Sequence, residues 1–348
     1  MKRAIASLFR LGAGLAAGVL LTAGAARAAE PAAPSPALTP ALKWWDGYLN
    51  SAQAVKLADG RTMNLFCIGS GAPVVVLDSG LGDGAWSWSG VQGAIAQKTR
   101  VCSFDRPGYG RSSPGPEPRD SRAIVADMAA MLKIAKVPGP YVLVGHSAGS
   151  FDVRLFAFTH PKDVAGVVLV DPSADNQMQR LAAAAPAIKA MQENAYGPMK
   201  ACMVDPRPPE AEKTCRRNLP PGVTPQIDAF FAGEATRPSN YKAILGEFDA
   251  FGSIDSGELV AAREKAGPHP LGDKPLVILT AANQMAPGLS AEDTAAIHKV
   301  WIAMHDEMTG LSTKGVNRIV EGASHYVHRD KPQVFLDTVF EVVDAARR

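Results

Sequence analysis

The 348-residue sequence lacks the short motifs that are typical of metal, redox and nucleotide-binding proteins. It contains no H-E-x-x-H pair and no cluster of cysteines and histidines, which argues against a metal site. None of its four cysteines belongs to a C-x-x-C motif, which argues against a redox centre. It has neither G-x-G-x-x-G nor G-K-[ST], so phosphate binding is a poor interpretation of its glycine-rich segments. We therefore expect neither a metal nor a cofactor.

The chain also lacks a strong charge of either sign. Residues 1–28 begin with Met-Lys-Arg, continue in a stretch rich in alanine, leucine and glycine, and end in Ala26-Arg27-Ala28, which is typical of a secretory signal peptide cut after Ala28. Its apolar core is short and rich in alanine and glycine compared with the ~20 strongly apolar residues of a spanning helix. We therefore expect no stable membrane span after cleavage. Cleavage removes four basic residues and no acid, which takes the formal charge from +2 to −2. We expect a periplasmic or secreted protein with no electrostatic reason to bind nucleic acid or an anionic membrane.

The order of apolar segments predicts one α/β unit with an insertion. After a flexible, proline- and alanine-rich leader at residues 29–43, strands alternate with helices, which implies a mostly parallel sheet with helices on both faces. The predicted strands lie in residues 54–58, 63–68, 73–78, 100–104, 141–146, 164–170, 275–280 and 316–320. Residues 173–273 instead combine Met, Phe and Pro with helical spacing. We interpret 44–172 and 274–348 as the core and 173–273 as a helical cap inserted over an active site.

The motif Gly145-His-Ser147-Ala-Gly149 carries the chemistry. An apolar, β-branched run precedes it and a segment with helical spacing, residues 151–160, follows it, so we expect Ser147 on a sharp strand-to-helix turn. Such a turn strains the backbone of the nucleophile and brings the flanking glycines close to neighbouring backbone. We expect Ser147 to be a nucleophile, with the amide of Ala148 directed at a developing oxyanion.

Two further glycine-rich loops follow predicted strands. In the first, Ser79–Trp88, we expect the amide of Leu81 to be a second oxyanion donor, although a merely flexible turn is the alternative. The second loop, residues 105–112, is interpreted as structural. We expect Asp105 and Arg106 to form a salt bridge there.

A serine hydroxyl needs a base to remove its proton and an acid to orient that base. Of the seven histidines, His325 fits the base best, because it directly follows the last predicted strand, on the rim where the nucleophile is expected. His328 is a weak rival. His298 and His305 lie within a predicted helix and are interpreted as surface residues, and we expect His146 to face away from the nucleophile.

For the acid, we expect a carboxylate at a strand end that lies between the nucleophile and the base in chain order. Asp171 meets this condition, because it directly follows the strand at 164–170. Its alternative interpretation is a capping aspartate, in which case Asp175, Glu292 or Asp293 would take the role.

Together these segments resemble the α/β-hydrolase fold superfamily over about residues 50–346, and within it the serine esterases and lipases of the exported bacterial type. The motifs that carry the resemblance are Val-Val-Val-Leu-Asp-Ser-Gly-Leu-Gly, Phe-Asp-Arg-Pro-Gly-Tyr-Gly-Arg-Ser, Gly-His-Ser-Ala-Gly-Ser and Ala-Ser-His-Tyr. The resemblance implies an eight-stranded sheet of the α/β-hydrolase fold, and it supports Leu81 and Ala148 as oxyanion donors. It also places a cap between the strands that end at Val170 and begin at Leu276.

The chain departs from that family in two places. Ser79-Gly80 stands where many relatives have His-Gly, and no acid follows the strand at 275–280, where relatives usually carry it. Some relatives place the acid where Asp171 stands.

In an exported chain, the four cysteines could form two disulfides. Cys202 and Cys215 lie close together in an irregular, proline-rich stretch and are the better candidate pair. In the fold implied by the resemblance, Cys67 and Cys102 lie on neighbouring strands. A second bridge is one interpretation of this pair, and two buried free thiols are an equally good one.

The sequence thus predicts a serine hydrolase that cleaves small-molecule carboxylic esters through Ser147, His325 and Asp171 and an acyl-enzyme intermediate. An acyltransferase, amidase or lactonase would use the same residues, and a non-catalytic ligand-binding scaffold is the alternative of another class. The serine excludes the aspartate nucleophile of dehalogenase and epoxide hydrolase relatives. The Met- and Phe-bearing cap favours a substrate with an apolar acyl or aromatic part, with Trp86 and Trp88 as candidate rim residues.

Overall fold

The computed structural model describes residues 39–348 apart from 205–210, 212–214, 217–218, 220–222, 252–253 and 283–288. The expected signal peptide and most of the expected leader therefore lie outside the described residues. Within the described ranges, no helix has the length and apolar character needed to cross a membrane. Nor do the His, Cys, Asp and Glu residues of these ranges form a group of three that could hold a metal ion.

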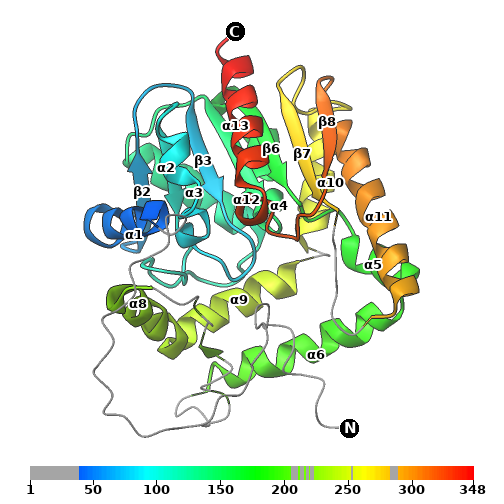
Figure 1. Ribbon diagram of the computed structural model, residues 1–348, viewed down its shortest axis with the longest axis horizontal. Coiled ribbons are helices and arrows are strands. Elements are labelled where there is room, and N and C mark those ends of the chain that lie inside the picture. Colours follow the sequence, from blue (N-terminus) through cyan, green and yellow to red (C-terminus); the bar gives the residue numbers. More distant parts are fainter. Residues whose placement is uncertain are drawn as a thin grey trace, which may run out of the picture.

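In the described residues, eight strands form one sheet in the order β1-β2-β4-β3-β5-β6-β7-β8. β1 and β2 pair antiparallel, as do β2 and β4, and every later pair is parallel. The predicted α/β fold with a mostly parallel sheet is confirmed (Figure 1). The strands are β1 (Gln53–Lys56), β2 (Thr62–Ile68), β3 (Val74–Asp78), β4 (Val101–Phe104), β5 (Tyr141–His146), β6 (Val164–Val170), β7 (Leu276–Ala281) and β8 (Gly315–Val320).

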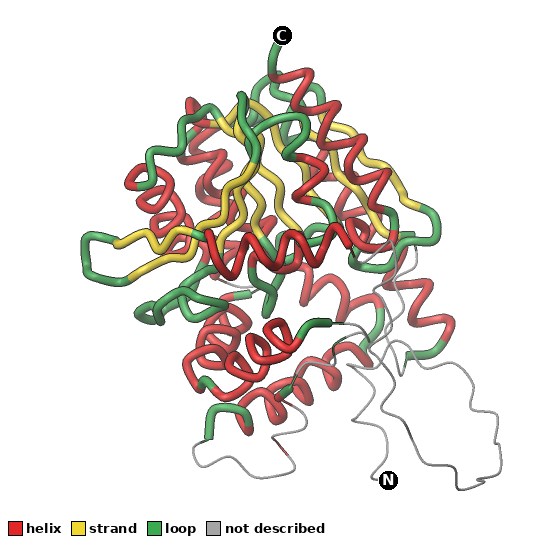
Figure 2. The backbone as a smooth tube through the Cα atoms, turned by 60° about the vertical axis from the view of Figure 1, so that its left-hand side comes forward, coloured by secondary structure: helices red, strands yellow, loops and turns green. Residues whose placement is uncertain are grey.

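Alternate residues of each central strand face two separate apolar layers. Val76 and Leu143 pack into one layer, and Val75 and Val144 pack into the other, because successive strand side chains point to opposite faces. The tube in Figure 2 shows helices on both sides of the strands. The first layer contains α3 (Ser121–Ile134), α4 (Gly149–Thr159), α10 (Ile254–Ala266) and α11 (Ala291–Thr309). The second layer contains α2 (Gln92–Ile95) and α13 (Pro332–Ala346).

Four neighbouring strands end at one edge of the sheet. Every residue of β3 and β5 is buried, as expected for parallel strands that are covered on both faces. The register pairs Asp78 with Gly145 and His146 with Val170, so β3, β5 and β6 end side by side. β7 ends next to them, since Leu279 pairs with Val170. Side chains on the loops that follow these strands therefore converge on this edge.

The segment 173–273 contains helices and no strand among its described residues. In Figure 1, α6 (Ala187–Ala201), α8 (Pro225–Thr236) and α9 (Pro238–Ala250) of this segment lie below the sheet. α10 packs against α3 and α4 instead, so the last part of the segment covers a face of the sheet. The cap boundaries stay a prediction. α5 (Gln177–Ala184) precedes these helices in the chain.

An N-terminal helix, α1 (Thr39–Ser51), packs its aromatic side chains between the sheet and α8. The prediction of a flexible leader at residues 29–43 is wrong for its last five residues, because they belong to this helix. Trp45 meets Phe231 of α8 edge-on, with 5.5 Å between ring centroids. Tyr48 is fully buried and stacks on Trp44, one helical turn earlier. The burial of these large rings, which a Pro- and Ala-rich composition does not reveal, fixes the helix.

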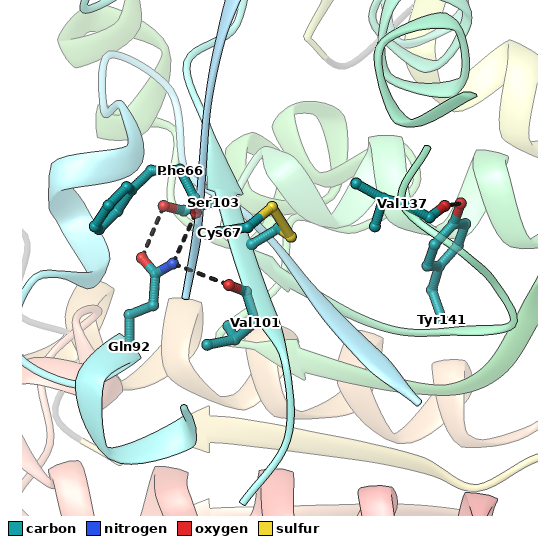
Figure 3. The surroundings of a disulfide bond; sticks show 8 residues. Phe66, Cys67, Gln92, Val101, Ser103, Val137 and Tyr141 are labelled. Atoms are coloured by element: carbon teal, nitrogen blue, oxygen red, sulfur yellow. Dashed lines mark hydrogen bonds between the residues drawn. A yellow bond between two sulfur atoms is a disulfide. The ribbon is translucent and has the colours of Figure 1, made fainter. Parts of the chain in front are cut away.

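Two disulfides connect Cys67 with Cys102 and Cys202 with Cys215. Cys67 on β2 and Cys102 on β4 are direct cross-strand partners with Cα atoms 4.0 Å apart, so the free-thiol interpretation of this pair is wrong. Figure 3 shows Gln92 of α2 beside the bridge, where its side-chain amide hydrogen-bonds to β2 at 2.9 Å and to β4 at 2.8 Å. Covalent and polar contacts therefore join the two antiparallel strands at the same place.

Candidate active site

Ser147 lies on the turn between β5 and α4, in the left-handed backbone region with a φ of 51°. This conformation is uncommon for a residue with a side chain and persists only where the surroundings impose it. The N–H of Ser147 donates to Val170 O at 3.1 Å, which ties the turn to the end of β6. The structure thus places Ser147 on the sharp strand-to-helix turn that the motif predicts.

Small residues on both sides of Ser147 let this turn form. A Cβ atom on Gly145 would lie 2.8 Å from Gly149 O, and one on Gly149 would lie 2.5 Å from Ser79 O. Real Cβ atoms do not approach backbone oxygens so closely, so a larger residue would force the backbone apart. The spacing of the two glycines is therefore a steric requirement of this turn.

Three side chains from three strand ends form a chain of hydrogen bonds. Ser147 Oγ lies 2.8 Å from His325 Nε2, and His325 Nδ1 lies 2.6 Å from Asp171 Oδ2. The Asp171 side chain is fully buried, whereas that of His325 is 35% exposed. The structure brings together the three residues that the sequence analysis selects as nucleophile, base and acid.

Asp171 is held by donors from two other elements. Its second oxygen, Oδ1, accepts from Ala281 N at 3.0 Å and from Trp301 Nε1 at 2.8 Å. Because both donors bond to Oδ1, Oδ2 is left to face His325. Trp301 of α11 carries only one signal in the sequence, an indole N–H that needs an acceptor if the ring is buried.

The loop after β3 lies against the nucleophile. A Cβ atom on Gly80 would lie 3.1 Å from Ser147 Cβ, so the next amide, that of Leu81, belongs to backbone beside the nucleophile. The amide of Ala148 directly follows Ser147. In the part of the chain that the structure describes, neither amide donates a hydrogen bond to the protein. Their role as oxyanion donors stays a prediction.

Two more histidines lie close to His325 in space. His146 and His328 are buried with 4.9 Å between their ring centroids. Burial lowers the pKa of both well below the usual value, and a second histidine adds to the shift, His325 for His146 and His146 for His328. Both rings are therefore neutral at pH 7. His146 Nε2 lies 2.9 Å from the backbone oxygen of His325, and His328 Nε2 lies 3.3 Å from Ser87 Oγ. Neither ring bonds to Ser147, so His328 is not a rival base in this geometry.

The prediction that His305 lies on the surface is wrong. His305 is fully buried, with Nδ1 2.7 Å from Thr280 Oγ1 and Nε2 2.8 Å from Pro172 O. Burial lowers the pKa of His305 to about 4, although the nearby Asp171 charge acts in the opposite direction. His298 is half-buried. Helical spacing predicts that both lie on one helix, but it does not tell which face turns inward.

The rival acids lie away from the hydrogen-bond chain. Asp175 pairs with Arg154 at 2.9 Å, and Glu292 and Asp293 lie in the first turn of α11. Among the described residues, none of the three hydrogen-bonds to His325. The geometry thus favours Asp171, which follows β6, as the acid.

Trp86 and Trp88 do not form the predicted rim. Trp88 is fully buried and stacks on Phe335 of α13, with 5.7 Å between ring centroids. Trp86 is 7% exposed and meets Phe231 of α8 edge-on at 5.2 Å. The prediction is wrong because a short helix, η2 (Ala85–Trp88), turns both rings inward, so they are packing residues.

The predicted salt bridge between Asp105 and Arg106 is also wrong. The two residues continue β4, where successive side chains point in opposite directions. Arg106 pairs with Asp78 and with Glu247, each at 2.9 Å. Asp105 is buried on the other side, where it accepts from Tyr48 Oη at 2.6 Å.

A pair of buried carboxyl groups lies next to this arginine. Burial raises the pKa of Asp78 to about 6, although the Arg106 charge opposes the shift. Burial and the Asp78 charge raise the pKa of Asp152 well above its usual value. The two carboxyl groups therefore titrate as a coupled pair. Asp152 could not be predicted from the sequence, because one acid in the first turn of a helix carries no sign of burial.

The sheet topology, the serine on its strained turn and the acid and histidine at neighbouring strand ends together define an α/β-hydrolase architecture. Comparison with protein families agrees, since the Alpha/beta hydrolase family matches residues 74–338. The chain belongs to this family.

Several known proteins are similar to the chain. The epoxide hydrolase CorEH has a TM-score of 0.59 at 15% identity, covering 86% of this chain and 99% of that one. An esterase from Exiguobacterium antarcticum, EaEST, has a TM-score of 0.58 at 16% identity, covering 84% and 99%. Such identities show the fold alone. The uncharacterized protein YqjL of Bacillus subtilis (strain 168) is 30% identical over 105 residues, which is 30% of this chain and 42% of YqjL, so the chain spans less than half of that relative.

Proposed function

We propose that this protein is a serine hydrolase that cleaves carboxylic esters. The observation that carries the proposal is the unbroken chain from Ser147 Oγ to His325 Nε2, at 2.8 Å, and from His325 Nδ1 to Asp171 Oδ2, at 2.6 Å. A serine hydroxyl is a useful nucleophile only when an oriented base takes its proton. Membership of the Alpha/beta hydrolase family supports the same interpretation.

In the proposed reaction, Ser147 Oγ attacks the ester carbonyl carbon while its proton passes to His325 Nε2. The carbonyl oxygen takes up the electron pair of the double bond, and the amides of Leu81 and Ala148 stabilise this charge. His325 then gives the proton to the leaving alcohol oxygen as the ester C–O bond breaks, which leaves the acyl group on Ser147. Water attacks this acyl-enzyme with His325 again as base, and the carboxylic acid leaves as Ser147 regains its proton. Asp171 holds the imidazole and stabilises its charged form.

We propose further that the substrate carries an apolar acyl or aromatic part. The partly exposed side chains of Ile244 and Phe248 share one face of α9, because they are spaced four residues apart. Phe251 directly follows the helix, and its partly exposed ring stacks on that of Phe248 with 6.3 Å between centroids. Ile244 Cδ1 lies 3.9 Å from the position of a Cβ atom on Gly82, in the loop that carries a proposed oxyanion amide. This apolar wall beside the loop supports an apolar substrate group.

A chain-length series of p-nitrophenyl esters tests the proposed substrate class. Burial of one CH₂ group is worth about 0.8 kcal/mol, so kcat/KM should rise about fourfold for each added methylene until the wall is covered. The series runs from acetate to octanoate. A kcat/KM that is flat or falls from the first member would contradict an apolar acyl site.

Substitution of the nucleophile tests the proposed reaction. Ser147→Ala should abolish hydrolysis of p-nitrophenyl butyrate and covalent labelling by a fluorophosphonate probe, while the melting temperature stays close to that of the wild type. Ser113→Ala is the matched control, because Ser113 Oγ contacts Thr62, outside the site, at 2.8 Å. Full activity in Ser147→Ala would contradict the proposal. Labelling of a residue other than Ser147 in the wild-type protein would also contradict it.

We propose that the protein works outside the cytoplasm, in the periplasm or as a secreted protein. The two disulfides support this location, because such bonds persist in oxidising compartments. Residues 1–28 also have the pattern of a signal peptide. Cell fractionation of the tagged full-length chain should find protein that starts at residue 29 outside the cytoplasm. Uncleaved protein with reduced thiols in the cytoplasm would contradict this.

A further inference from the structure

One buried arginine holds the loop Ser79–Gly82, which we call the oxyanion loop. Arg106 Nη1 donates to Ser79 O at 2.5 Å, and Nη2 donates to Gly80 O at 2.9 Å. Its other N–H groups donate to Asp78 Oδ1 at the end of β3, at 2.9 Å, and to both carboxylate oxygens of Glu247 at 2.9 Å. All five N–H donors of the side chain are used, and it is 2% exposed, so the guanidinium has one fixed orientation.

These bonds fix the direction of the Leu81 amide. The carbonyl of Gly80 and the N–H of Leu81 belong to one planar trans peptide, so they point in opposite directions. Because Arg106 holds the carbonyl oxygen, the N–H is turned away from Arg106. Gly80 itself lies against the nucleophile, since a Cβ atom there would be 3.1 Å from Ser147 Cβ. A charged donor on the carbonyl also polarises the peptide and makes its N–H a stronger donor.

Glu247 connects the oxyanion loop to α9 of the inserted segment. It is 5% exposed, and its paired contact with Arg106 supplies acceptors for two of the five N–H groups. Glu247 Oε2 also accepts from Tyr109 Oη at 2.8 Å, and the same hydroxyl oxygen accepts from Gly82 N at 3.4 Å. A buried guanidinium that loses part of its pairing carries a large desolvation penalty and moves to recover it. Removal of the Glu247 charge should therefore shift Arg106 and, with it, the oxyanion loop.

We infer that Glu247 is a positioning residue of the oxyanion hole, which acts through Arg106 to aim the Gly80–Leu81 peptide at the tetrahedral intermediate. The inference rests on the proposed function and deepens it, because it gives the inserted helix α9 a part in the chemistry as well as in substrate contact. A residue that only lines the substrate site would change KM. A residue that aims an oxyanion donor changes kcat, because the negative charge on the oxygen develops in the transition state.

The test compares two isosteric substitutions of buried glutamates in the inserted segment. Glu247→Gln keeps the side-chain shape and removes the charge. Glu234→Gln of α8 is the matched control, because Glu234 is 6% exposed and accepts from Gly110 N at 2.7 Å, in the loop after Arg106. Loss of one oxyanion donor costs about 10²–10³ in kcat, and a misdirected donor should cost less, so we expect kcat to fall by about 10–100-fold in Glu247→Gln. KM should stay within about threefold of the wild type, since ground-state contacts are kept.

A transition-state analogue separates positioning from general damage. A trifluoromethyl ketone adds to the serine and forms a tetrahedral oxyanion, so its inhibition constant should rise in Glu247→Gln by the same factor by which kcat falls. Rates are expressed per active site, counted by fluorophosphonate labelling, so that misfolded protein does not contribute. Tyr109→Phe is the second variant, which removes the hydroxyl between Glu247 and Gly82 with little change in volume, and its kcat and inhibitor binding should weaken in the same direction.

The outcomes distinguish this inference from the proposed function. Unchanged kcat and inhibitor binding in Glu247→Gln, or in Tyr109→Phe if Glu247→Gln does not fold, would overturn the positioning role and leave the serine hydrolase intact. An equal loss in Glu234→Gln would also overturn it. A wild-type protein that the fluorophosphonate does not label would overturn both.

Discussion

Replacement of Asp171 by asparagine separates the chemical role of this carboxyl group from its structural role. Oδ1 accepts two N–H groups, from Ala281 N and Trp301 Nε1, so the asparagine oxygen should occupy that place. Its NH₂ group then takes the position of Oδ2, which lies 2.6 Å from His325 Nδ1. An amide NH₂ can only donate, so Nδ1 becomes the acceptor and the ring proton moves to Nε2.

The new proton on Nε2 points at Ser147 Oγ, which lies 2.8 Å away, and the imidazole can no longer take the serine proton. In Ser-His-Asp enzymes, this exchange lowers kcat about 10⁴-fold because it stabilises the wrong tautomer. At about 1.36 kcal/mol for each tenfold change, the transition state loses about 5 kcal/mol. We expect a loss of this order for Asp171→Asn. The fold should survive, because both donors on Oδ1 keep their acceptor.

Steady-state hydrolysis of p-nitrophenyl butyrate measures the effect, with urea unfolding as the check on stability. Glu292→Gln is the matched control, because Glu292 is an exposed acid in the first turn of α11 that the sequence leaves as a rival. A kcat of Asp171→Asn above about a tenth of the wild-type value would refute the tautomer argument. A larger loss in Glu292→Gln would move the role of the acid to α11.

Three predictions concern stability, each measured as the unfolding free energy from urea titration. Burial lowers the folded-state pKa of His305 to about 4, so the unfolded state binds the proton first as the pH falls from about 6.5. The unfolding free energy of the wild type should therefore fall by about 3 kcal/mol between these pH values through this group. His305→Gln should remove this dependence, and an unchanged pH slope would contradict it. Burial raises the pKa of Asp152, so the unfolded state releases the proton first and stability falls as the pH rises above the unfolded value. Asp152→Asn should therefore gain stability at pH 8 relative to pH 4, since a neutral amide does not titrate, whereas a loss at pH 8 would contradict the raised pKa of Asp152. Replacement of both Cys67 and Cys102 by alanine should cost about 4 kcal/mol, since their bridge closes a 35-residue loop, and a cost below about 1 kcal/mol would contradict this.

The sheet could be predicted from the sequence because its signals are local. β3 is an unbroken run of valine and leucine ending in Asp78, and such a run fits a strand that is covered on both faces. The glycines around Ser147 are required by the turn itself, so their spacing is visible without any knowledge of the rest of the chain. The three hydrogen-bonded side chains also follow strand ends, and parallel strand ends share one edge.

The direction of a side chain could not be predicted where a distant partner decides it. Arg106 turns away from its neighbour because Glu247, 141 positions later, supplies two carboxylate oxygens in a buried place. His305 turns inward because Thr280 and a backbone oxygen offer it two hydrogen-bond partners. Trp88 is buried by a short helix whose start has no side-chain cap to reveal it. In each case the pattern places the residue on the right element, and a long-range contact then selects the face.

The absence of an acid after β7 is explained by the way in which β6 and β7 end. Neighbouring strands lie about 4.8 Å apart, so an acid that follows β6 is within side-chain reach of the end of β7. Asp171 has a left-handed backbone with a φ of 41°. Two hydrogen bonds join it to β7: its N–H donates to Leu279 O at 2.7 Å, and its Oδ1 accepts from Ala281 N at 3.0 Å. The carboxyl group thus sits at the junction of the two strands, where an acid on either strand could face the same imidazole. The strained turn is what brings the acid from β6 to this position, so Asp171 and Ser147 share one structural device, a left-handed residue at the end of a buried parallel strand.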